Sequence, residues 1–279
     1  MMIDFQVTSR CHLNCKYCFD ILKGTPEKDT ETLFKSIDKL IRCGVTGLVI
    51  TGGEPLLRDD IEDVIEYLHQ KEIYIYLSTQ GNYIRKLRPD VIKLVDCFGI
   101  PLDSLNLETN EALGRPRNQS EIFADAYNYI REYNQTAQIK MGTVVNKKNK
   151  DEIIDLGCYI QGNYNDAVWR LYQFNPIGNG EKNREELRLS RDEFDGIVEN
   201  TSRYCGGLNI SAMPIEDAEN GYFFVGPLMN LLIFEEIGFK DIGLLQELTD
   251  DNVKKCLYSD YSEIAKKTTS NRIWVGGKS

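Results

Sequence analysis

Apolar and polar residues alternate along the first 180 residues in two rhythms, one with a period of two and one with the period of a helix. Short apolar runs predict six β-strands, near residues 3–8, 47–51, 73–78, 97–102, 138–145 and 167–174. Apolar residues at helical spacing predict helices near residues 31–43, 60–71, 83–94, 121–132 and 150–161. Because strands and helices alternate, the pattern predicts an α/β fold with a parallel sheet and right-handed crossovers.

The rest of the chain gives weaker signals. Residues 103–118 and 178–190 are polar and predict loops, and the tail after residue 190 carries helical patterns. The most apolar stretch, 222–234, contains Gly226 and Pro227, and it predicts a buried strand followed by the start of a helix. At 13 residues this stretch is too short to span a bilayer, so we expect no contact with a membrane.

Composition narrows the classes of function. The hydrophobic share of 42% and the charged share of 27% are those of a folded globular protein. With 33 Lys and Arg against 43 Asp and Glu, the net charge of −10 repels phosphate backbones, so we expect no nucleic-acid partner. The two histidines, His12 and His69, lack the setting of a Ser-His-Asp triad. The first ten residues contain no apolar run, from which we expect no leader and a cytoplasmic location.

The eight cysteines divide into two sets. Five are spaced 47 to 61 residues apart, which predicts small buried side chains rather than disulfides: Cys43, Cys97, Cys158, Cys205 and Cys256. The other three, Cys11, Cys15 and Cys18, lie within eight residues. Thiolates this dense predict a site for a soft metal.

The number of thiolates separates two kinds of metal site. A structural zinc site needs four ligands, and His12 is the neighbour that could supply the fourth. A four-iron cluster held by three thiolates keeps one iron open, as a catalytic metal site requires. The sequence therefore favours a [4Fe–4S] cluster over zinc.

A second motif, Thr51-Gly52-Gly53-Glu54-Pro55, ends the strand predicted near 47–51. Glycines let backbone groups approach a ligand closely because they have no Cβ. Glu54 adds an acceptor or a local anchor, and Pro55 stiffens the exit from the strand. Alone, such a motif is typical of a strand-to-helix turn. Here Gly52 lies 34 residues after Cys18, and a helix is predicted between the two motifs.

The two motifs together resemble those of the radical S-adenosylmethionine (radical SAM) enzymes, whose CxxxCxxC signature is matched by CHLNCKYC, residues 11–18. The resemblance implies a partial (β/α)6 TIM-like barrel in residues 1–180, with residues 181–279 as an extension over the barrel mouth. It implies a [4Fe–4S] cluster on the three clustered cysteines, S-adenosylmethionine (AdoMet) on the open iron, and an external one-electron donor. A 5′-deoxyadenosyl radical would form. The implied AdoMet-binding residues are Tyr17, Gly52, Gly53, Glu54, Pro55, Thr79, Asp103 and Arg115.

Among radical SAM enzymes, the chain resembles the viperin-like nucleotide dehydratases from about residue 5 to its end. Lys140 in QIKMGTVVN and Arg170 in VWRLYQF fall on matching basic positions. The resemblance implies that Lys23, Lys140 and Arg170 bind substrate phosphates and that Tyr222 donates the final hydrogen. The implied reaction removes water from the ribose of a nucleoside triphosphate and yields a 3′-deoxy-3′,4′-didehydro nucleotide, an antiviral chain terminator.

The substrate half of the site departs from that family. Gly47 and Val49 stand where those enzymes have lysine and asparagine, and Asp4 replaces an asparagine, so another substrate stays open. As strand residues of an acidic protein, Lys140 and Arg170 have structural ion pairs as an alternative explanation. Tyr222 lies in an apolar run, where core packing is the alternative.

Two other functions compete with the dehydratase. The segment FNPIGNGEKN, residues 174–183, resembles a stretch of radical SAM enzymes that modify ribosomal peptides, and another small metabolite is a related alternative. A non-enzymatic iron–sulfur redox sensor would need neither Gly52 nor Gly53. Formation of 5′-deoxyadenosine would separate an enzyme from a sensor.

Overall fold

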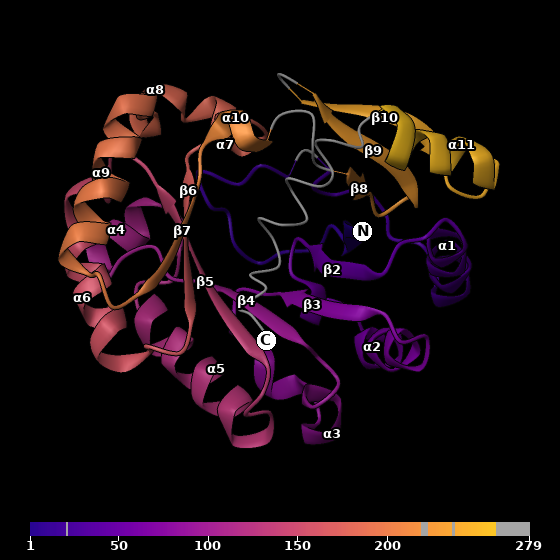
Figure 1. Ribbon diagram of the computed structural model, residues 1–279, viewed down its shortest axis with the longest axis horizontal. Coiled ribbons are helices and arrows are strands. Elements are labelled where there is room, and N and C mark those ends of the chain that lie inside the picture. The colour runs from indigo at the N-terminus through magenta and orange to yellow at the C-terminus, as the bar shows by residue number, and fades with distance from the viewer. Residues whose placement is uncertain (21, 219–222, 236–237, 261–279) are drawn as a thin grey trace. The chain divides into compact units, whose positions relative to one another are not determined.

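The computed structural model of the 279-residue chain describes residues 1–20, 22–218, 223–235 and 238–260, and Figure 1 shows its helices and strands. These residues form two compact units. The first contains residues 1–10, 22–77 and the described residues from 216 onward, and the second contains residues 11–20 and 78–215. No helix of the described part is long and apolar enough to cross a membrane.

The first unit is built on parallel strands with helices between them. Its strands β1 (Met2–Thr8), β2 (Gly47–Gly52) and β3 (Tyr74–Ser78) pair in that order, and every residue of β1 is buried. Figure 1 shows α1 (Thr30–Arg42) and α2 (Ile61–Gln70) along one side of these strands. The side chain of Asp29 caps α1 by accepting the N–H of Thr32, which fixes where this helix begins.

Strands from the end of the chain extend the first unit. The short strand β8 (Phe223–Val225) pairs in parallel with β1, and β9 (Asn230–Glu235) and β10 (Gly238–Leu244) follow as antiparallel strands. The order within this unit is therefore β10-β9-β8-β1-β2-β3. Its remaining helical segments are α10 (Ile215–Ala218), which begins at the last residue of the second unit, α11 (Asp250–Lys254), a 3-10 helix (Pro55–Leu57) and a π-helix (Lys255–Asp260).

The second unit is a parallel sheet with helices on one face. Its strands run in the order β4 (Cys97–Pro101), β5 (Gln138–Val145), β6 (Val168–Gln173) and β7 (Asn209–Met213). Figure 1 shows α5 (Gln119–Tyr133), α6 (Ile153–Asn163) and α9 (Arg191–Tyr204) along one side of these strands. Trp169 points to this helical side, because a Cβ at Gly157 of α6 would lie 2.9 Å from its ring.

Because successive side chains of a strand point to opposite faces of the sheet, the residues next to Trp169 and Met141 lie on the other face, which we call the inner face of the second unit. It carries Lys140, Gly142 and Val144 of β5 and Arg170 and Tyr172 of β6, since Arg170 stands opposite Gly142 in the register. Lys140 and Arg170 are each only 4% exposed. Two buried cations therefore share one face of adjacent strands.

The six strands predicted from the sequence are all present, with ends within about two residues, as such boundaries usually are. The helix predicted at 83–94 is wrong. The chain forms a 3-10 helix (Ile84–Lys86) and the short helix α3 (Pro89–Ile92), separated by Arg88 in an extended conformation with φ −64° and ψ 150°. Pro89 is the cause, because a proline drives the preceding residue out of the helical region.

Both segments predicted as polar loops contain short helices. Residues 103–118 include α4 (Leu107–Ala112), which begins at Asn106 because the side chain of Asn106 accepts the N–H groups of Glu108 and Thr109. Residues 178–190 include α7 (Asn179–Lys182) and α8 (Arg184–Leu187). Helices of four to six residues bury too few apolar positions to give a periodic signal.

The tail after residue 190 contains strands that the sequence did not predict. Strand β7 was missed because its residues are only half-buried apart from Met213, so the apolar run is weak. The stretch predicted as a strand and a helix start forms the antiparallel pair β8 and β9 instead, with a turn at Gly226, whose N–H donates to the carbonyl of Asn230. Tyr222 lies outside the described residues. The predicted domain boundary at residue 180 stays a prediction.

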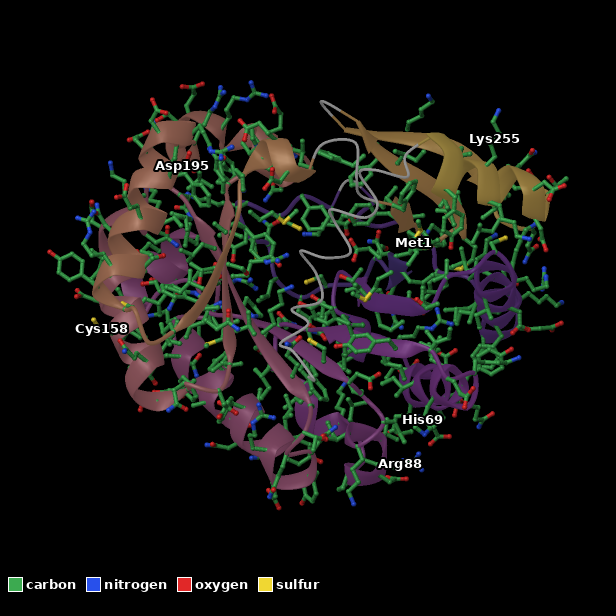
Figure 2. The ribbon with its side chains drawn as sticks, in the orientation of Figure 1. Met1, His69, Arg88, Cys158, Asp195 and Lys255 are labelled. Carbon is green, nitrogen blue, oxygen red and sulfur yellow. The ribbon has the colours of Figure 1, made fainter. Side chains whose placement is uncertain are left out.

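One prediction about the scattered cysteines is wrong. Cys43, Cys97, Cys205 and Cys256 are buried, but Cys158 is exposed. Figure 2 shows Cys158 at the outer side of the helical layer, where α6 turns toward solvent. Its helical neighbour Gly157 packs against Trp169, so the next position along the helix faces outward.

Candidate cluster and cofactor site

The three clustered cysteines lie in a loop that follows β1, and we call residues 11–20 the cysteine loop. A tight turn joins two of them, because the N–H of Cys18 donates to the carbonyl of Cys15 at 3.2 Å. The Sγ atom of Cys11 accepts the N–H of Leu13 at 3.4 Å. Cys15 is buried, and Cys11 and Cys18 are partly buried. The loop therefore presents three thiols from one short segment.

The surroundings of these thiols are apolar. Cys15 and Tyr17 form one buried cluster with Leu113, Phe174 and Leu187, and Leu13, Cys18 and Val144 pack against it. Burial raises the pKa of the Cys15 thiol, while the positive charge of Arg115 lowers it. Burial also raises the pKa of Cys18, to about 11. A dry pocket that offers three sulfur ligands fits an iron–sulfur cluster, whose potential depends on such a shell.

His12, the fourth ligand that a zinc site would need, has another partner. Its Nδ1 atom lies within hydrogen-bond distance of the hydroxyl of Tyr83, and the two rings meet edge to face with centroids 5.8 Å apart. Among the residues that the structure describes, no three histidine, cysteine or acidic side chains are close enough to hold a single metal ion.

Asp103 is the centre of a buried network beside the cysteine loop. Its Oδ2 atom accepts hydrogen bonds from the Tyr17 hydroxyl at 2.5 Å, from Nε of Arg115 at 3.1 Å and from Nε2 of Gln119 at 3.0 Å. Its Oδ1 atom accepts the N–H of Val144 at 3.0 Å. Because Asp103 is fully buried, all four donors come from the protein. Its carboxylate therefore orients neighbouring groups.

Tyr17 and Arg115 complete that network. Nε of Arg115 donates to the Tyr17 hydroxyl, and the guanidinium carbon lies 5.4 Å from the centre of the Tyr17 ring. Burial raises the pKa of the Tyr17 phenol well above its ordinary value. Burial alone would lower the pKa of Arg115, but the nearby charges of Tyr17, Cys15 and Asp103 raise it. Both of these hydrogen bonds use Nε, so the two terminal nitrogens of Arg115 have no hydrogen-bond partner among the described residues.

The glycine motif lies in the first unit and is tied to β1. The N–H of Gly53 donates to the carbonyl of Thr8 at 3.0 Å, and the N–H of Glu54 donates to the carbonyl of Arg10 at 2.7 Å. A Cβ at Gly52 would lie 2.3 Å from the carbonyl oxygen of Thr8, so only glycine fits there. The motif is thus bonded to the residues that immediately precede Cys11 in the chain.

Glu54 and Pro55 begin a 3-10 helix directly after the glycines. Glu54 is fully buried, and its Oε1 atom accepts the N–H of Leu56 at 3.1 Å, while Pro55 occupies the first position of the turn. This supports the prediction of a local anchor at Glu54. Arg58, which follows, reaches back and donates to the carbonyl of Val7 at 3.0 Å.

The remaining predicted residues have different settings. Thr79 is 4% exposed, its N–H donates to the carbonyl of Gly99, and its hydroxyl accepts the N–H of Gly81, so it shapes a turn at the end of β3. Lys140 is buried on the inner face. Lys23 is exposed.

Among the described residues, Arg170 contacts only neutral groups. Its Nε atom donates to Oγ of Ser211 at 3.0 Å, Nη1 lies 4.0 Å from Sδ of Met213, and the guanidinium carbon lies 5.9 Å from the centre of the Tyr172 ring. No described carboxylate forms a salt bridge with this buried cation. The structural ion pair that the sequence allowed at this position is therefore absent from the described part of the chain.

Sequence reasoning missed several residues of the network. Gln119 was placed before a helix, yet it bonds both the N–H and the carboxylate of Asp103. Ser211 lies on the strand that the sequence did not reveal. Asn149 donates to the carbonyl of Asp103 at 2.9 Å. Each acts over a long sequence separation, so no local pattern signals it.

Comparison with known families identifies the motifs. The sequence profile of the radical SAM superfamily matches residues 5–157, which is more than half of the chain and includes both the cysteine loop and the glycine motif.

Two characterised relatives cover most of the chain. An S-adenosylmethionine-dependent nucleotide dehydratase from Selenomonas ruminantium is 26% identical over 252 residues, which is 87% of this chain and 89% of that protein. A GTP 3′,8-cyclase from Helicobacter pylori is 32% identical over 290 aligned positions, covering 97% of this chain and 84% of that protein.

Solved structures show the same fold. Streptococcus suis SuiB bound to S-adenosylmethionine superposes with a TM-score of 0.70 at 14% identity, over 95% of this chain and 67% of that one. This confirms the predicted α/β fold with its parallel sheet. On the profile match and on these relatives, the chain belongs to the radical SAM superfamily, whose members are enzymes that use a [4Fe–4S] cluster and AdoMet.

Proposed function

We propose that this radical SAM enzyme acts on a nucleoside triphosphate and removes water from its ribose, giving a 3′-deoxy-3′,4′-didehydro nucleotide. The observation that carries the proposal is the buried guanidinium of Arg170, whose contacts within the described part of the chain are neutral. A buried charge without a counter-charge is costly, so such a side chain is best explained by an anionic ligand. A polyphosphate supplies that charge and accepts the forked hydrogen bonds of a guanidinium.

The position of Arg170 agrees with a substrate role. Lys140 lies on the same inner face of the adjacent strand, diagonal to Arg170 in the register. Val144, four residues further along that face, packs against the cluster of Cys15 and Tyr17. Four residues of strand span roughly 13 Å. Within the second unit, Lys140 therefore lies about 13 Å along the strand from Val144, and Arg170, whose register partner Gly142 is two residues from Val144, lies about half as far.

The proposed roles of the other residues follow from their contacts. Cys11, Cys15 and Cys18 would hold the cluster, and the terminal nitrogens of Arg115 would bind the carboxylate of AdoMet or a phosphate, oriented by Asp103 and Tyr17. When bound, the cluster and AdoMet supply a carbon radical that removes a hydrogen from the substrate. Loss of the 3′ hydroxyl as water then needs one further electron and one proton, for which an external donor is required.

Further roles rest on the motifs alone. Gly52, Gly53, Glu54, Pro55 and Thr79 are proposed to serve AdoMet, Lys23 is proposed to bind phosphate, and Tyr222, outside the described residues, is proposed to donate the final hydrogen. The cytoplasm stays the predicted location.

The base and ribose region of the substrate is expected to differ from that of the viperin-like family. A Cβ at Gly47 would lie 3.2 Å from Cβ of Tyr74 and 3.3 Å from Sδ of Met2, so the room for the family's lysine is taken. The relatives themselves differ in the reaction that their names give, since one is a dehydratase and the other a GTP cyclase. Both names involve a nucleotide, which supports the substrate class more than the reaction.

The peptide-modifying alternative rests on weaker support. SuiB has been solved with a precursor peptide, but at 14% identity the likeness concerns the fold. In the segment 174–183, which suggested this alternative, Asn179 and Asn183 make hydrogen bonds inside the second unit. Those contacts give the segment a structural role that requires no peptide.

The test is an anaerobic turnover experiment. The reconstituted enzyme is given AdoMet, dithionite and each nucleoside triphosphate separately, with a Cys18→Ala variant as the control without a complete cysteine set. We expect one nucleotide to stimulate 5′-deoxyadenosine formation and to yield a product lighter by one water. A product of unchanged mass would indicate ring closure and overturn dehydration. No nucleotide product, with turnover on peptides, would overturn the substrate class.

A further inference from the structure

The segment Gly178–Asn183 lies against the cysteine loop and contacts it through both backbone and side chains. The N–H groups of Asn179 and Gly180 donate to the carbonyl of Cys18, at 2.9 Å and 3.3 Å. Gly178 has a φ of +57°, and a Cβ there would lie 2.8 Å from the carbonyl carbon of Phe19. The backbones of the two segments therefore touch, which a larger residue at position 178 would prevent.

Two asparagine side chains add bonds to the same loop. Nδ2 of Asn179 donates to the carbonyl of Cys15 at 2.8 Å. Nδ2 of Asn183 donates to the carbonyl of Lys16 at 3.1 Å and to that of Asn179 at 3.0 Å. Asn179 thus bonds the carbonyls of Cys15 and Cys18 at once, with its side chain and its backbone.

We propose that Asn179 is a positioning residue that fixes Cys15 and Cys18 before the cluster binds. The proposal rests on the cluster-binding role given above to these two cysteines. The carbonyl carbon and the Cβ of one residue are bonded to the same Cα, so holding the two carbonyls in place restrains the positions from which both thiols leave the chain. Groups that orient metal ligands in this way contribute about tenfold or more to metal affinity.

The experiment compares Asn179 with an asparagine of similar geometry elsewhere in the second unit. Nδ2 of Asn134 also donates to two backbone carbonyls, those of Ile92 and Val95, both at 3.0 Å, and Asn134 makes no contact with the cysteine loop. The variants are Asn179→Ala, the milder Asn179→Ser, and Asn134→Ala as the matched control. Each is reconstituted anaerobically, and iron content, the rate of iron loss to a chelator and the electron paramagnetic resonance spectrum of the reduced cluster are measured.

The proposal expects a defect in the cluster that exceeds any loss of folding. Both Asn179 variants should lose iron to the chelator about ten times faster than the unmodified enzyme, with an altered spectrum, while circular dichroism shows a folded chain. Asn134→Ala should lower the melting temperature and leave iron loss and the spectrum unchanged. Equal iron loss and equal spectra in the Asn179 variants and the unmodified enzyme would overturn the proposal.

These measurements are made without any nucleotide in the sample. A failure of the proposed dehydratase reaction would therefore leave the positioning role of Asn179 standing, and the reverse also holds. Both substitutions keep the backbone N–H that bonds Cys18. If Asn179→Ala does not fold, Asn179→Ser, which keeps a small polar side chain, decides the question.

Discussion

The hydroxyl of Tyr17, within the cysteine loop, donates a hydrogen bond of 2.5 Å to the buried carboxylate of Asp103. Arg115 bonds both groups and lies over the Tyr17 ring. The same three residue types recur at the surface of the second unit. There Asp166 accepts bonds from Tyr127 at 2.6 Å and from Arg131 at 3.0 Å, and Arg131 also lies 5.4 Å from the Tyr127 ring. The two triads differ mainly in burial.

The substitution Asp103→Asn should therefore be costly. It leaves the charge of Arg115 buried without its partner and removes an acceptor from Tyr17, so we expect a loss of about 3 kcal/mol in the free energy of unfolding. AdoMet affinity should fall at least tenfold because Arg115 loses its orientation. Urea unfolding of the apo protein and equilibrium binding of AdoMet to the reconstituted protein check both effects.

Asp166→Asn is the matched control. Its carboxylate is 45% exposed, so water replaces the lost bonds and the cost should stay below about 1 kcal/mol, with unchanged AdoMet affinity. Similar losses for the two variants would mean that burial is not what makes the Asp103 network important.

Arg170→Met should weaken substrate binding without weakening the fold. If the guanidinium binds a substrate phosphate, then removing its charge should lower kcat/KM for the nucleotide about 100-fold, because charged hydrogen bonds are lost. The apo protein should be as stable as before or more stable, because an unpaired buried charge is replaced by an apolar chain. Steady-state turnover measures kcat/KM, and melting temperatures with and without nucleotide measure the stability of the apo protein and its binding of nucleotide.

Arg203→Met provides the comparison, since Arg203 lies on an exposed helix face and pairs with Glu199. It should change neither the melting temperature nor the shift caused by nucleotide. A strong loss of apo stability in Arg170→Met, with normal nucleotide binding, would show that Arg170 is structural.

Gly114→Ala should destabilise the cysteine loop. Gly114 has a φ of +75°, and a Cβ there would lie 2.4 Å from the carbonyl oxygen of Asn14, so we expect a loss of about 2 kcal/mol. Gly196→Ala in α9 is the opposite case, because nothing lies within 4 Å of the added atom. It should stabilise the protein by up to about 1 kcal/mol. Thermal unfolding of both variants tests the pair, and a neutral Gly114→Ala would contradict the close approach.

Asp60 should contribute to acid sensitivity. Burial raises its pKa, but hydrogen bonds from Arg58 and Thr30 lower it by more, so its pKa in the fold lies below the ordinary value of 3.8. A carboxyl with a lowered pKa stabilises the fold above pH 3.8, and that stability is lost as the pH falls through the lowered pKa. Asp60→Asn should therefore be less stable near pH 7 but lose less stability between pH 4 and pH 2. Unfolding curves across this range give the free energy of unfolding of both proteins. The same pH dependence in Asp60→Asn and in the unmodified protein would contradict this role of Asp60.

The order of strands and the two motifs could be read from the sequence for a local reason. A parallel strand buried on both faces needs a run of apolar residues, and such a run marks β2. In β1, apolar Ile3, Phe5 and Val7 alternate with polar residues, which is the other local signal of a strand. The cysteine spacing and the glycine motif are equally local, because both occupy consecutive residues. Where local signals conflict, the prediction failed, as at Pro89, which breaks the helix expected across it.

The sequence by itself determined the α/β class, the thiol-rich loop and the pairing of that loop with a glycine motif. Only the tertiary structure decided which groups support the loop. Asp103 and Asn179 bond to it from segments 86 and 164 residues away in sequence, and Gln119 in turn holds Asp103. It also decided that the described neighbours of Arg170 are neutral, since strand register and burial, not residue type, determine which groups surround a cation.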